Sequence, residues 1–456
     1  MLSAAVAAAA FTALVRRLWP DSTVWASRLF AAVAAGTFVT AAFPYGLGLA
    51  LALVALLALA YGRMLLFALA VVSTLAASPL AFLFLVLIVG CVGAARRGRA
   101  VVKPAAVVAA ACVAGLLVWR LFPDSGLYPF ATGEWLAALA FCAGGLAMTW
   151  RVPRARVLAT FFGAYAALCT FSYLIPSLVG ENVDRLRYAA LPITALVLSL
   201  RGWRPWPVAA AALALACAWN LSPFAYTFAH SAEDPSAAAA FWRPAIRFLR
   251  RELTPDYRVE VVDTAGHWEA VYLARARIPL ARGWYRQDDF PQNELLYDRF
   301  DARAYRRWLR SLGVRYVVLT SAPADYSARR EASLLRSGRS GLRVVFRSRT
   351  TEIFAVPHPV PIVTGPDRPA VLRLTQTAID LWVRRAGHYR VAIRYSPYLA
   401  AGGACVARTR SGMTLLDVRR PGRLDLAFAL TAARAFAALT GSTSTCPERG
   451  RRDPDG

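Results

Sequence analysis

The segment of the chain richest in reactive side chains is residues 281–289, with the sequence ARGWYRQDD. It has neither helical nor strand periodicity, and loops of this kind often carry binding residues. Asp288 and Asp289 are catalytic candidates, because paired carboxylates bind a divalent cation and a carboxyl of raised pKa acts as a general base. The competing interpretation is a turn in which an aspartate caps a helix and pairs with Arg282 or Arg286. No metal ligand is assigned.

The remaining side chains of this loop are candidates for contacts with a substrate, and they are Trp284, Tyr285, Arg286 and Gln287. His267 belongs to the same group, because His267-Trp268-Glu269 opens a predicted helix over residues 267–275 and could contact an acceptor hydroxyl. The alternative for His267 and Glu269 is an exposed helix start, where a carboxylate interacts favourably with the helix dipole.

A second candidate site is the loop Gly180-Glu181-Asn182-Val183-Asp184-Arg185. Glu181 and Asp184 are the other two catalytic candidates. Arg185 is a candidate for binding the phosphate of an anionic lipid, as is Arg187, since guanidinium groups pair well with phosphate. The alternative is a charged cap on a short turn.

The composition indicates that two different solvents surround these candidate sites. The chain has 456 residues, 57% of them hydrophobic, and a mean hydropathy of +0.43. Residues 1–225 contain 15 arginines, one lysine and five acidic residues, whereas residues 226–456 contain 37 arginines and 22 acidic residues. We therefore expect lipid around the first part and water around the second. Such a composition excludes a disordered protein.

The chain lacks the motifs of several common function classes. Its arginines are scattered among acids in the second half, so nucleic acid is not expected as a partner, whereas membrane lipid is. There is no phosphate-binding loop, no dinucleotide-binding glycine pattern, no zinc-type Cys/His spacing and no nucleophile elbow.

The first half predicts about ten membrane spans, since a helix needs about 20 mostly apolar residues to cross the hydrocarbon. The apolar stretches are 2–15, 28–43, 45–62, 64–77, 79–95, 104–121, 135–150, 157–176, 187–200 and 205–222. Ser78-Pro79 separates two of them, because proline cannot continue a helix. No Asp, Glu, Lys or His lies within these stretches, which disfavours a transporter.

The charged residues between the stretches predict the orientation in a plasma membrane. Arginines concentrate in alternate loops, at 96–99, 151–156 and 201–204, and acids occupy the loops between them. Basic loops stay in the cytoplasm. The C-terminal half is therefore predicted to be extracytoplasmic.

The C-terminal half predicts two folded domains. Residues 241–356 alternate helical and strand patterns and indicate an α/β domain, whose first helix, 241–251, either lies on the membrane or caps the domain. Residues 357–445 contain short strands separated by Gly and Pro and indicate a small β-sandwich-like domain. Cys405 and Cys446 are candidates for a disulfide, with two free thiols as the alternative. Residues 446–456 are predicted to be disordered.

From residue 28 to about residue 432 the chain resembles actinobacterial polytopic membrane proteins related to the GT-C glycosyltransferase superfamily. The residues that carry the resemblance are Ser78-Pro79, Gly180-Glu181-Asn182, the segment 283–288, Tyr305, Trp308-Leu309, the segment 314–317, Asp325-Tyr326-Ser327 and the segment 395–398. The resemblance implies transfer of a sugar from a polyprenyl-phosphate donor on the outer face of the membrane.

The chain departs from this family at its start. GT-C enzymes place the catalytic acid in the first outer loop after an N-terminal span, and no such loop precedes the first apolar stretch here. The expectation is a truncated N-terminus or a protein without the activity. The alternatives are therefore a membrane glycosyltransferase, a non-catalytic cell-envelope protein that binds polysaccharide or a partner enzyme, and a transporter.

Overall fold

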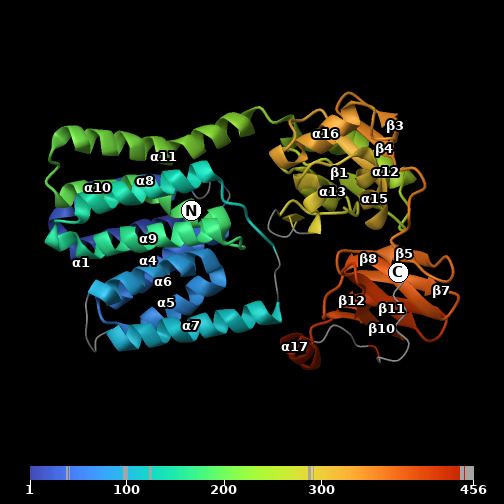
Figure 1. The fold of residues 1–456 in the computed structure, drawn as a ribbon, viewed down its shortest axis with the longest axis horizontal. Helices are drawn as coiled ribbons and strands as arrows, with labels where there is room; N and C mark the ends of the chain where they lie inside the picture. Colours follow the sequence, from blue (N-terminus) through green and yellow to red (C-terminus); the bar gives the residue numbers. More distant parts are fainter. Residues whose placement is uncertain are drawn as a thin grey trace. The chain divides into compact units, whose positions relative to one another are not determined.

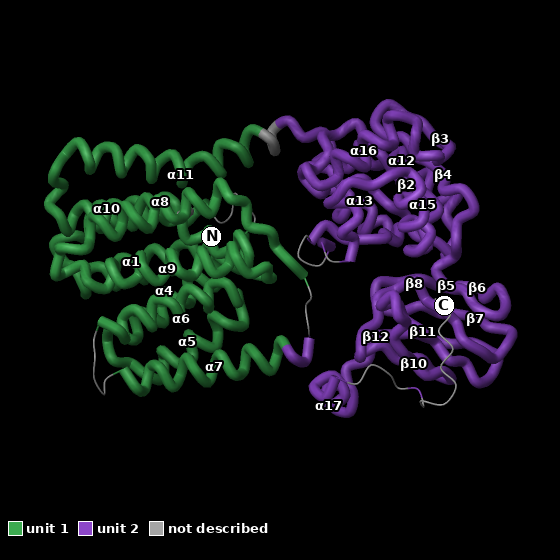
Figure 2. Tube along the Cα trace, in the orientation of Figure 1, with its two compact units in different colours: residues 1–119, 124–232 green, residues 120–123, 233–456 purple. Residues whose placement is uncertain are grey.

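A computed structural model describes residues 1–36, 40, 42–95, 101–122, 126–285, 289–290, 292–441 and 446. The chain forms two compact units, shown in Figure 2: residues 1–119 with 124–232, and residues 120–123 with 233–456. We call them unit 1 and unit 2 and describe each by itself.

Unit 1 is built from helices, most of which are labelled in Figure 1. The α-helices are α1 (Leu2–Leu18), α2 (Thr23–Ala34), α4 (Phe43–Ala60), α5 (Met64–Ala77), α6 (Pro79–Ala95), α7 (Val102–Leu121), α8 (Thr132–Thr149), α9 (Arg156–Leu174), α10 (Ala190–Leu200) and α11 (Trp206–Ala232). Three 3₁₀ segments complete it: η1 (Pro20–Ser22), η3 (Pro153–Ala155) and η4 (Gly180–Ala189).

Apolar helices suited to a membrane are confirmed, but the prediction of about ten spans is not supported. Of the described helices, four are long and apolar enough to cross a membrane: Phe43–Ala60, Val102–Leu121, Pro153–Leu174 and Trp206–Ala229. Met64–Ala77, Pro79–Ala95 and Ala190–Leu200 are apolar but shorter. A helix rises only about 1.5 Å per residue, so a helix of 14 residues is shorter than the hydrocarbon core of about 30 Å.

Two prolines of unit 1 have different effects on their helices. Ser78 is extended and separates α5 from α6, as predicted, and its hydroxyl accepts the Ala81 N–H at 3.2 Å. Pro223 instead lies inside α11, which continues to Ala232, beyond the predicted boundary at residue 225. A proline costs a helix one hydrogen bond, which does not prevent the helix from continuing here.

Unit 2 begins with a four-stranded sheet in the order β1-β2-β4-β3. The strands are β1 (Arg258–Val261), β2 (Val314–Thr320), β3 (Arg343–Arg347) and β4 (Thr351–Ala355). β1 and β2 are parallel, and the other pairs are antiparallel. The helical segments are η5 (Pro235–Ala237), α12 (Ala239–Glu252), α13 (Glu269–Arg275), η6 (Glu294–Tyr297), α15 (Ala302–Ser311), η7 (Tyr326–Ala328) and α16 (Arg329–Arg336).

Helices cover both faces of this sheet, so it forms the middle of three layers. Along β2, Val317 and Leu319 enter a core with α15 and α16. Tyr316 and Val318 enter the opposite core, with α12 and α13. This alternation follows from the two-residue period of a strand. The apolar face of α12 is thus used for packing, with Trp242 fully buried, which favours the capping role over the membrane surface.

The rest of unit 2 is rich in β-structure. Eight strands form one sheet in the order β5-β8-β11-β10-β9-β12-β7-β6. They are β5 (Val363–Thr364), β6 (Ala370–Leu374), β7 (Ala378–Val383), β8 (Gly387–Arg394), β9 (Leu399–Ala401), β10 (Ala404–Arg408), β11 (Met413–Val418) and β12 (Gly422–Phe428). Val391 and Leu416 share one core with Leu381 and Leu424 from the other half of the sheet. The sheet therefore folds over on itself.

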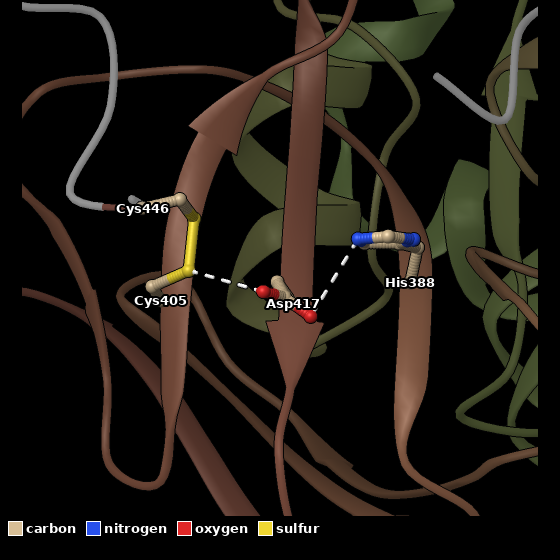
Figure 3. The surroundings of a disulfide bond; sticks show 4 residues. All are labelled: His388, Cys405, Asp417 and Cys446. Atoms are coloured by element: carbon tan, nitrogen blue, oxygen red, sulfur yellow. Dashed lines mark hydrogen bonds and ion pairs between the residues drawn. A yellow bond between two sulfur atoms is a disulfide. The ribbon is translucent and has the colours of Figure 1, made fainter. Parts of the chain in front are cut away.

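The chain continues into helix α17 (Ala432–Leu439). Figure 3 shows Cys446 joined to Cys405 of β10 by a disulfide. Asp417 of β11 lies beside this bond, and His388 of β8 lies on the other side of Asp417, with 3.6 Å between His388 Nε2 and Asp417 Oδ1. Disorder was predicted for residues 446–456. Cys446 is described and lies in this disulfide, and the remaining residues of that segment lie outside the described residues.

Candidate functional site

A buried cluster of charges lies at the carboxyl ends of the parallel strands β1 and β2. Its centre is Arg282, whose side chain is 5% exposed. The guanidinium lies 2.7 Å from Glu260 Oε1, 2.7 Å from Asp263 Oδ2, 3.4 Å from Asp289 Oδ2 and 3.4 Å from Glu331 Oε2. In open α/β sheets, ligands bind outside the carboxyl ends of the strands.

The protonation of this cluster is governed by burial and by the single arginine. Burial raises the pKa of Glu260 and of Glu331 above the usual range, against the opposing effect of Arg282. Burial raises the pKa of Asp263 to about 7, again against Arg282. Burial alone would lower the pKa of Arg282, but the four carboxylates outweigh this effect and raise that pKa. Tyr305 donates its hydroxyl proton to Glu331 Oε1 at 2.6 Å.

The sequence candidate Asp289 is a member of this cluster. Its Oδ1 accepts from Asn293 Nδ2 at 2.8 Å, and its Oδ2 accepts from the Tyr297 hydroxyl at 2.9 Å in addition to contacting Arg282. The structure therefore matches the alternative interpretation, in which an aspartate of the loop pairs with Arg282. The candidates Arg286, Gln287 and Asp288 lie outside the described residues.

Three other sequence candidates lie close to the cluster. Trp284 stacks over His267, with ring centroids 5.4 Å apart, and its side chain is half exposed. Tyr285 meets Trp284 edge to face. The imidazole Nδ1 of His267 lies 3.4 Å from Glu269 Oε1, and its Nε2 lies 3.9 Å from Asp325 Oδ2. Glu269 is buried, so the exposed helix start considered for this position is wrong.

The neighbourhood of His267 can hold a cation. Burial alone would lower the pKa of His267, but the carboxylates of Glu269, Asp263 and Asp325 outweigh it and raise the pKa. One ligand atom each from Asp263, His267 and Glu269 lies within 4.8 Å of the other two.

A basic cavity of about 240 Å³ adjoins the cluster, between the two sheets of unit 2. Its lining includes Arg258, Arg282, Arg394, Tyr285 and Asp289. Arg258 donates to the Leu312 and Ala392 carbonyls, and burial lowers its pKa to about 10, with Arg390 and Arg394 acting in the same direction.

The loop candidates of the first half line a separate cavity inside unit 1, of about 300 Å³. Polar side chains from η4 and neighbouring segments meet apolar side chains from α2, α4 and α11 there. The polar members include Thr40, Tyr128, Glu181, Asn182, Asp184, Arg185 and Asn220, and the apolar members include Phe30, Val33, Leu49, Pro223 and Phe224.

Asp184, one of the charged residues of this lining, is already paired with Arg187, which does not line the cavity. Asp184 and Arg187 are buried, and Arg187 Nε lies 3.0 Å and 2.9 Å from the two carboxylate oxygens of Asp184. Arg187 also pairs with Glu134. Arg185, in contrast, lies with its guanidinium 5.8 Å from the centroid of the Tyr45 ring, and no carboxylate in the described part of the chain pairs with it.

Several residues of both sites were missed by the sequence analysis. Glu260, Glu331 and Asn220 are all buried, and each interrupts an apolar pattern: Glu260 within strand β1, Glu331 on the inward face of α16 and Asn220 within α11. A polar residue at a position of core periodicity is the signal that could have found them.

The chain matches no protein-family model and no curated protein.

Proposed function

We propose that this chain is an integral membrane protein of the cell envelope that transfers a sugar from a polyprenyl-phosphate donor on the outer face of the membrane. The observation that carries the proposal is the cavity in unit 1. It combines an apolar wall with a small set of polar groups that includes one arginine and two carboxylates. An isoprenoid phosphate has the same division into an apolar chain and an anionic head.

Arg185 is the group proposed to bind the donor phosphate. Arginine recognises phosphate with two parallel hydrogen bonds, and a guanidinium not paired with a carboxylate keeps its donors available. Arg187 is excluded from this role because Asp184 and Glu134 engage it. Asp184 is therefore assigned to holding Arg187.

Glu181 is proposed as the general base. It lines the cavity, and its Oε2 accepts the Ala131 N–H at 3.2 Å. In the reaction, Glu181 takes the proton of an acceptor hydroxyl while the hydroxyl oxygen forms a bond to the anomeric carbon. The bond between that carbon and the phosphate oxygen breaks, and polyprenyl phosphate leaves with the electron pair. The acceptor would be a polysaccharide of the envelope.

Transfer in membranes from a panel of radiolabelled polyprenyl-phosphate sugars tests this proposal. Glu181→Gln should reduce transfer about 100-fold or more, which is the usual contribution of a general base. Arg185→Gln should weaken donor binding and raise KM. Arg154→Gln is the matched control, because Arg154 is exposed in a different loop, and it should keep full activity. Absence of transfer by the wild type, or full activity of both cavity variants, would contradict the proposal.

A non-catalytic protein that binds polysaccharide is the second candidate function. It is favoured by Trp284 and Tyr285, which are both about half exposed and meet at nearly a right angle. Exposed aromatic rings offer flat apolar faces on which a sugar ring can stack. Glycan binding by the full chain in nanodiscs, lost in Trp284→Ala and kept in Trp382→Ala, without any transfer, would favour this function. Trp382 is similarly exposed on strand β7.

A further inference from the structure

We infer that Asp263, His267 and Glu269 form a binding site for a divalent transition-metal ion in unit 2. Asp263 follows strand β1, His267 lies in the turn after it, and Glu269 begins α13. Each offers one ligand atom, and the three atoms lie within 4.8 Å of one another. The set differs from the Asp288-Asp289 pair considered from the sequence and lies outside the cavity proposed for sugar transfer.

Two buried atoms of these residues have no hydrogen-bond partner among the described residues. They are His267 Nδ1 and Glu269 Oε1, and they face each other at 3.4 Å. The Glu269 side chain is only 3% exposed. Its other oxygen, Oε2, is held by the Thr264 hydroxyl at 2.7 Å and by the Thr264 N–H at 3.3 Å, so Oε1 is aimed at His267. A buried polar atom without a partner is costly, and a metal ion would satisfy both atoms.

The spacing of these two atoms suits a metal. Metal–nitrogen and metal–oxygen bonds to zinc are about 2.1 Å long. If an ion makes two such bonds to atoms 3.4 Å apart, the angle between the two bonds is roughly 108°, which is close to the tetrahedral angle. Asp263, whose ligand atom lies within 4.8 Å of the other two, supplies the third ligand, and a fourth position remains for water or another ligand.

The residues around the site hold its ligands in place. Asp325 Oδ2 lies 3.9 Å from the far nitrogen of the imidazole, His267 Nε2, which places a carboxylate behind the histidine. Arg282 donates to Asp263 Oδ2 at 2.7 Å. Arg282 thereby orients the Asp263 carboxylate, as partners of metal ligands do, whereas at 3.9 Å Asp325 acts on His267 through its charge and not through a hydrogen bond.

The chemistry of the donor atoms indicates the kind of ion. One nitrogen and two oxygen ligands suit Zn²⁺, Co²⁺ or Mn²⁺ better than Ca²⁺, which prefers oxygen alone.

The competing explanation is that His267 is protonated and simply pairs with Glu269 and Asp325. Metal titration separates the two. The full chain in nanodiscs, treated with a chelator and then titrated with Zn²⁺ by calorimetry, should bind one equivalent. Co²⁺ should produce a visible absorption band and quench the fluorescence of Trp284, which stacks on His267.

Three variants decide the outcome. His267→Asn and Glu269→Gln should each weaken Zn²⁺ binding at least tenfold. His388→Asn is the matched control, since His388 makes a similar contact with Asp417 elsewhere in unit 2, at 3.6 Å (Figure 3), and should bind like the wild type. Glu269→Gln preserves the shape of the side chain, and thermal unfolding without metal will show that each variant folds.

The inference is overturned if the wild type shows no saturable binding, or if His267→Asn and Glu269→Gln bind Zn²⁺ as tightly as His388→Asn. Neither measurement uses a sugar donor. Failure of the proposed transfer activity and failure of the metal site are therefore distinguishable.

Discussion

At the scale of single residues, the most consequential side chain in unit 2 is Arg282. Its guanidinium contacts four carboxylates while being almost completely buried. Ionised groups removed from water are stable only when they are paired and hydrogen-bonded. Arg282 therefore holds together residues that would otherwise repel one another at the end of the sheet.

Arg282→Met should destabilise unit 2 by about 3–5 kcal/mol, because removing one partner of a buried ion pair leaves the other charge uncompensated. Arg347→Met is the matched control, since Arg347 pairs with Glu352 at 2.8 Å but is 68% exposed. Such exposed pairs contribute about 0–1 kcal/mol. Thermal unfolding of the full chain, with hydrogen exchange in Val314–Thr320 as the local readout, measures both. Equal effects of the two variants would contradict the central role of Arg282.

At the scale of elements, a helix cap and a disulfide bond stabilise unit 2. Asp301 caps the N-terminus of helix α15, and its carboxylate accepts the Ala304 N–H at 2.6 Å. Helix α17 is followed by Cys446, which is bonded to β10. A capping carboxylate responds to pH and a disulfide responds to reduction, so each can be tested separately.

The start of α15 should become less stable in acid. The Ala304 N–H, which donates to Asp301, lowers the pKa of that carboxyl, and Arg307 and Arg303 add to the effect. Because the folded pKa is below the unfolded value of about 3.9, the ionised carboxylate stabilises the helix at neutral pH. This contribution is lost as the pH falls through the folded pKa.

Hydrogen exchange in Ala302–Ser311, corrected for the intrinsic effect of pH, measures this change. Asp301→Asn should retain a cap but lose this pH dependence. Asp425→Asn, at an exposed position of β12, should behave like the wild type. If Asp301→Asn titrates like the wild type, the assignment is wrong.

Removing the disulfide should destabilise the β-rich part of unit 2. The bond joins residues 41 apart in the chain, and closing a loop of this length is worth up to about 4 kcal/mol in the chain-entropy model. Cys405→Ser/Cys446→Ser should therefore lower the unfolding temperature by several degrees. Cys217→Ser, which replaces a free cysteine in α11, should change it little. Alkylation of both thiols in the unreduced wild type would show that the bond is absent.

At the scale of the whole molecule, the proposed function depends on which side of the membrane each unit faces. Four described helices are long and apolar enough to cross a bilayer. The arginine-rich loops of unit 1 are expected to stay in the cytoplasm, and unit 2 is expected to lie outside it. A lipid-linked sugar presented on the outer face requires this arrangement.

Labelling with a membrane-impermeant maleimide tests the orientation. Ser337→Cys, at an exposed position of unit 2, should react in intact cells. Arg154→Cys, at an exposed position of the loop before α9, should react only after permeabilisation. The wild type gives the background from the native cysteines. The opposite pattern would reverse the proposed orientation and exclude transfer on the outer face.

The sequence predicted much of the local structure, because periodicity and chain breaks are local properties. The expected alternation of helices and strands over residues 241–356 is present, and short strands follow it in the rest of unit 2. The break at Ser78-Pro79 is also present. The predicted count of about ten spans is not supported, because several of the predicted apolar stretches form helices shorter than a span among the described residues.

By itself, the sequence determined the apolar, helical first half and the β-rich end, because each depends on hydropathy and on the repeat of apolar residues. Only the tertiary structure determined which charged side chains form ion pairs. Glu260 and Glu331 lie far apart in the chain, and both reach Arg282 because β1 pairs in parallel with β2 and α16 packs on the same sheet. Parallel pairing is a long-range contact, which local pattern does not encode.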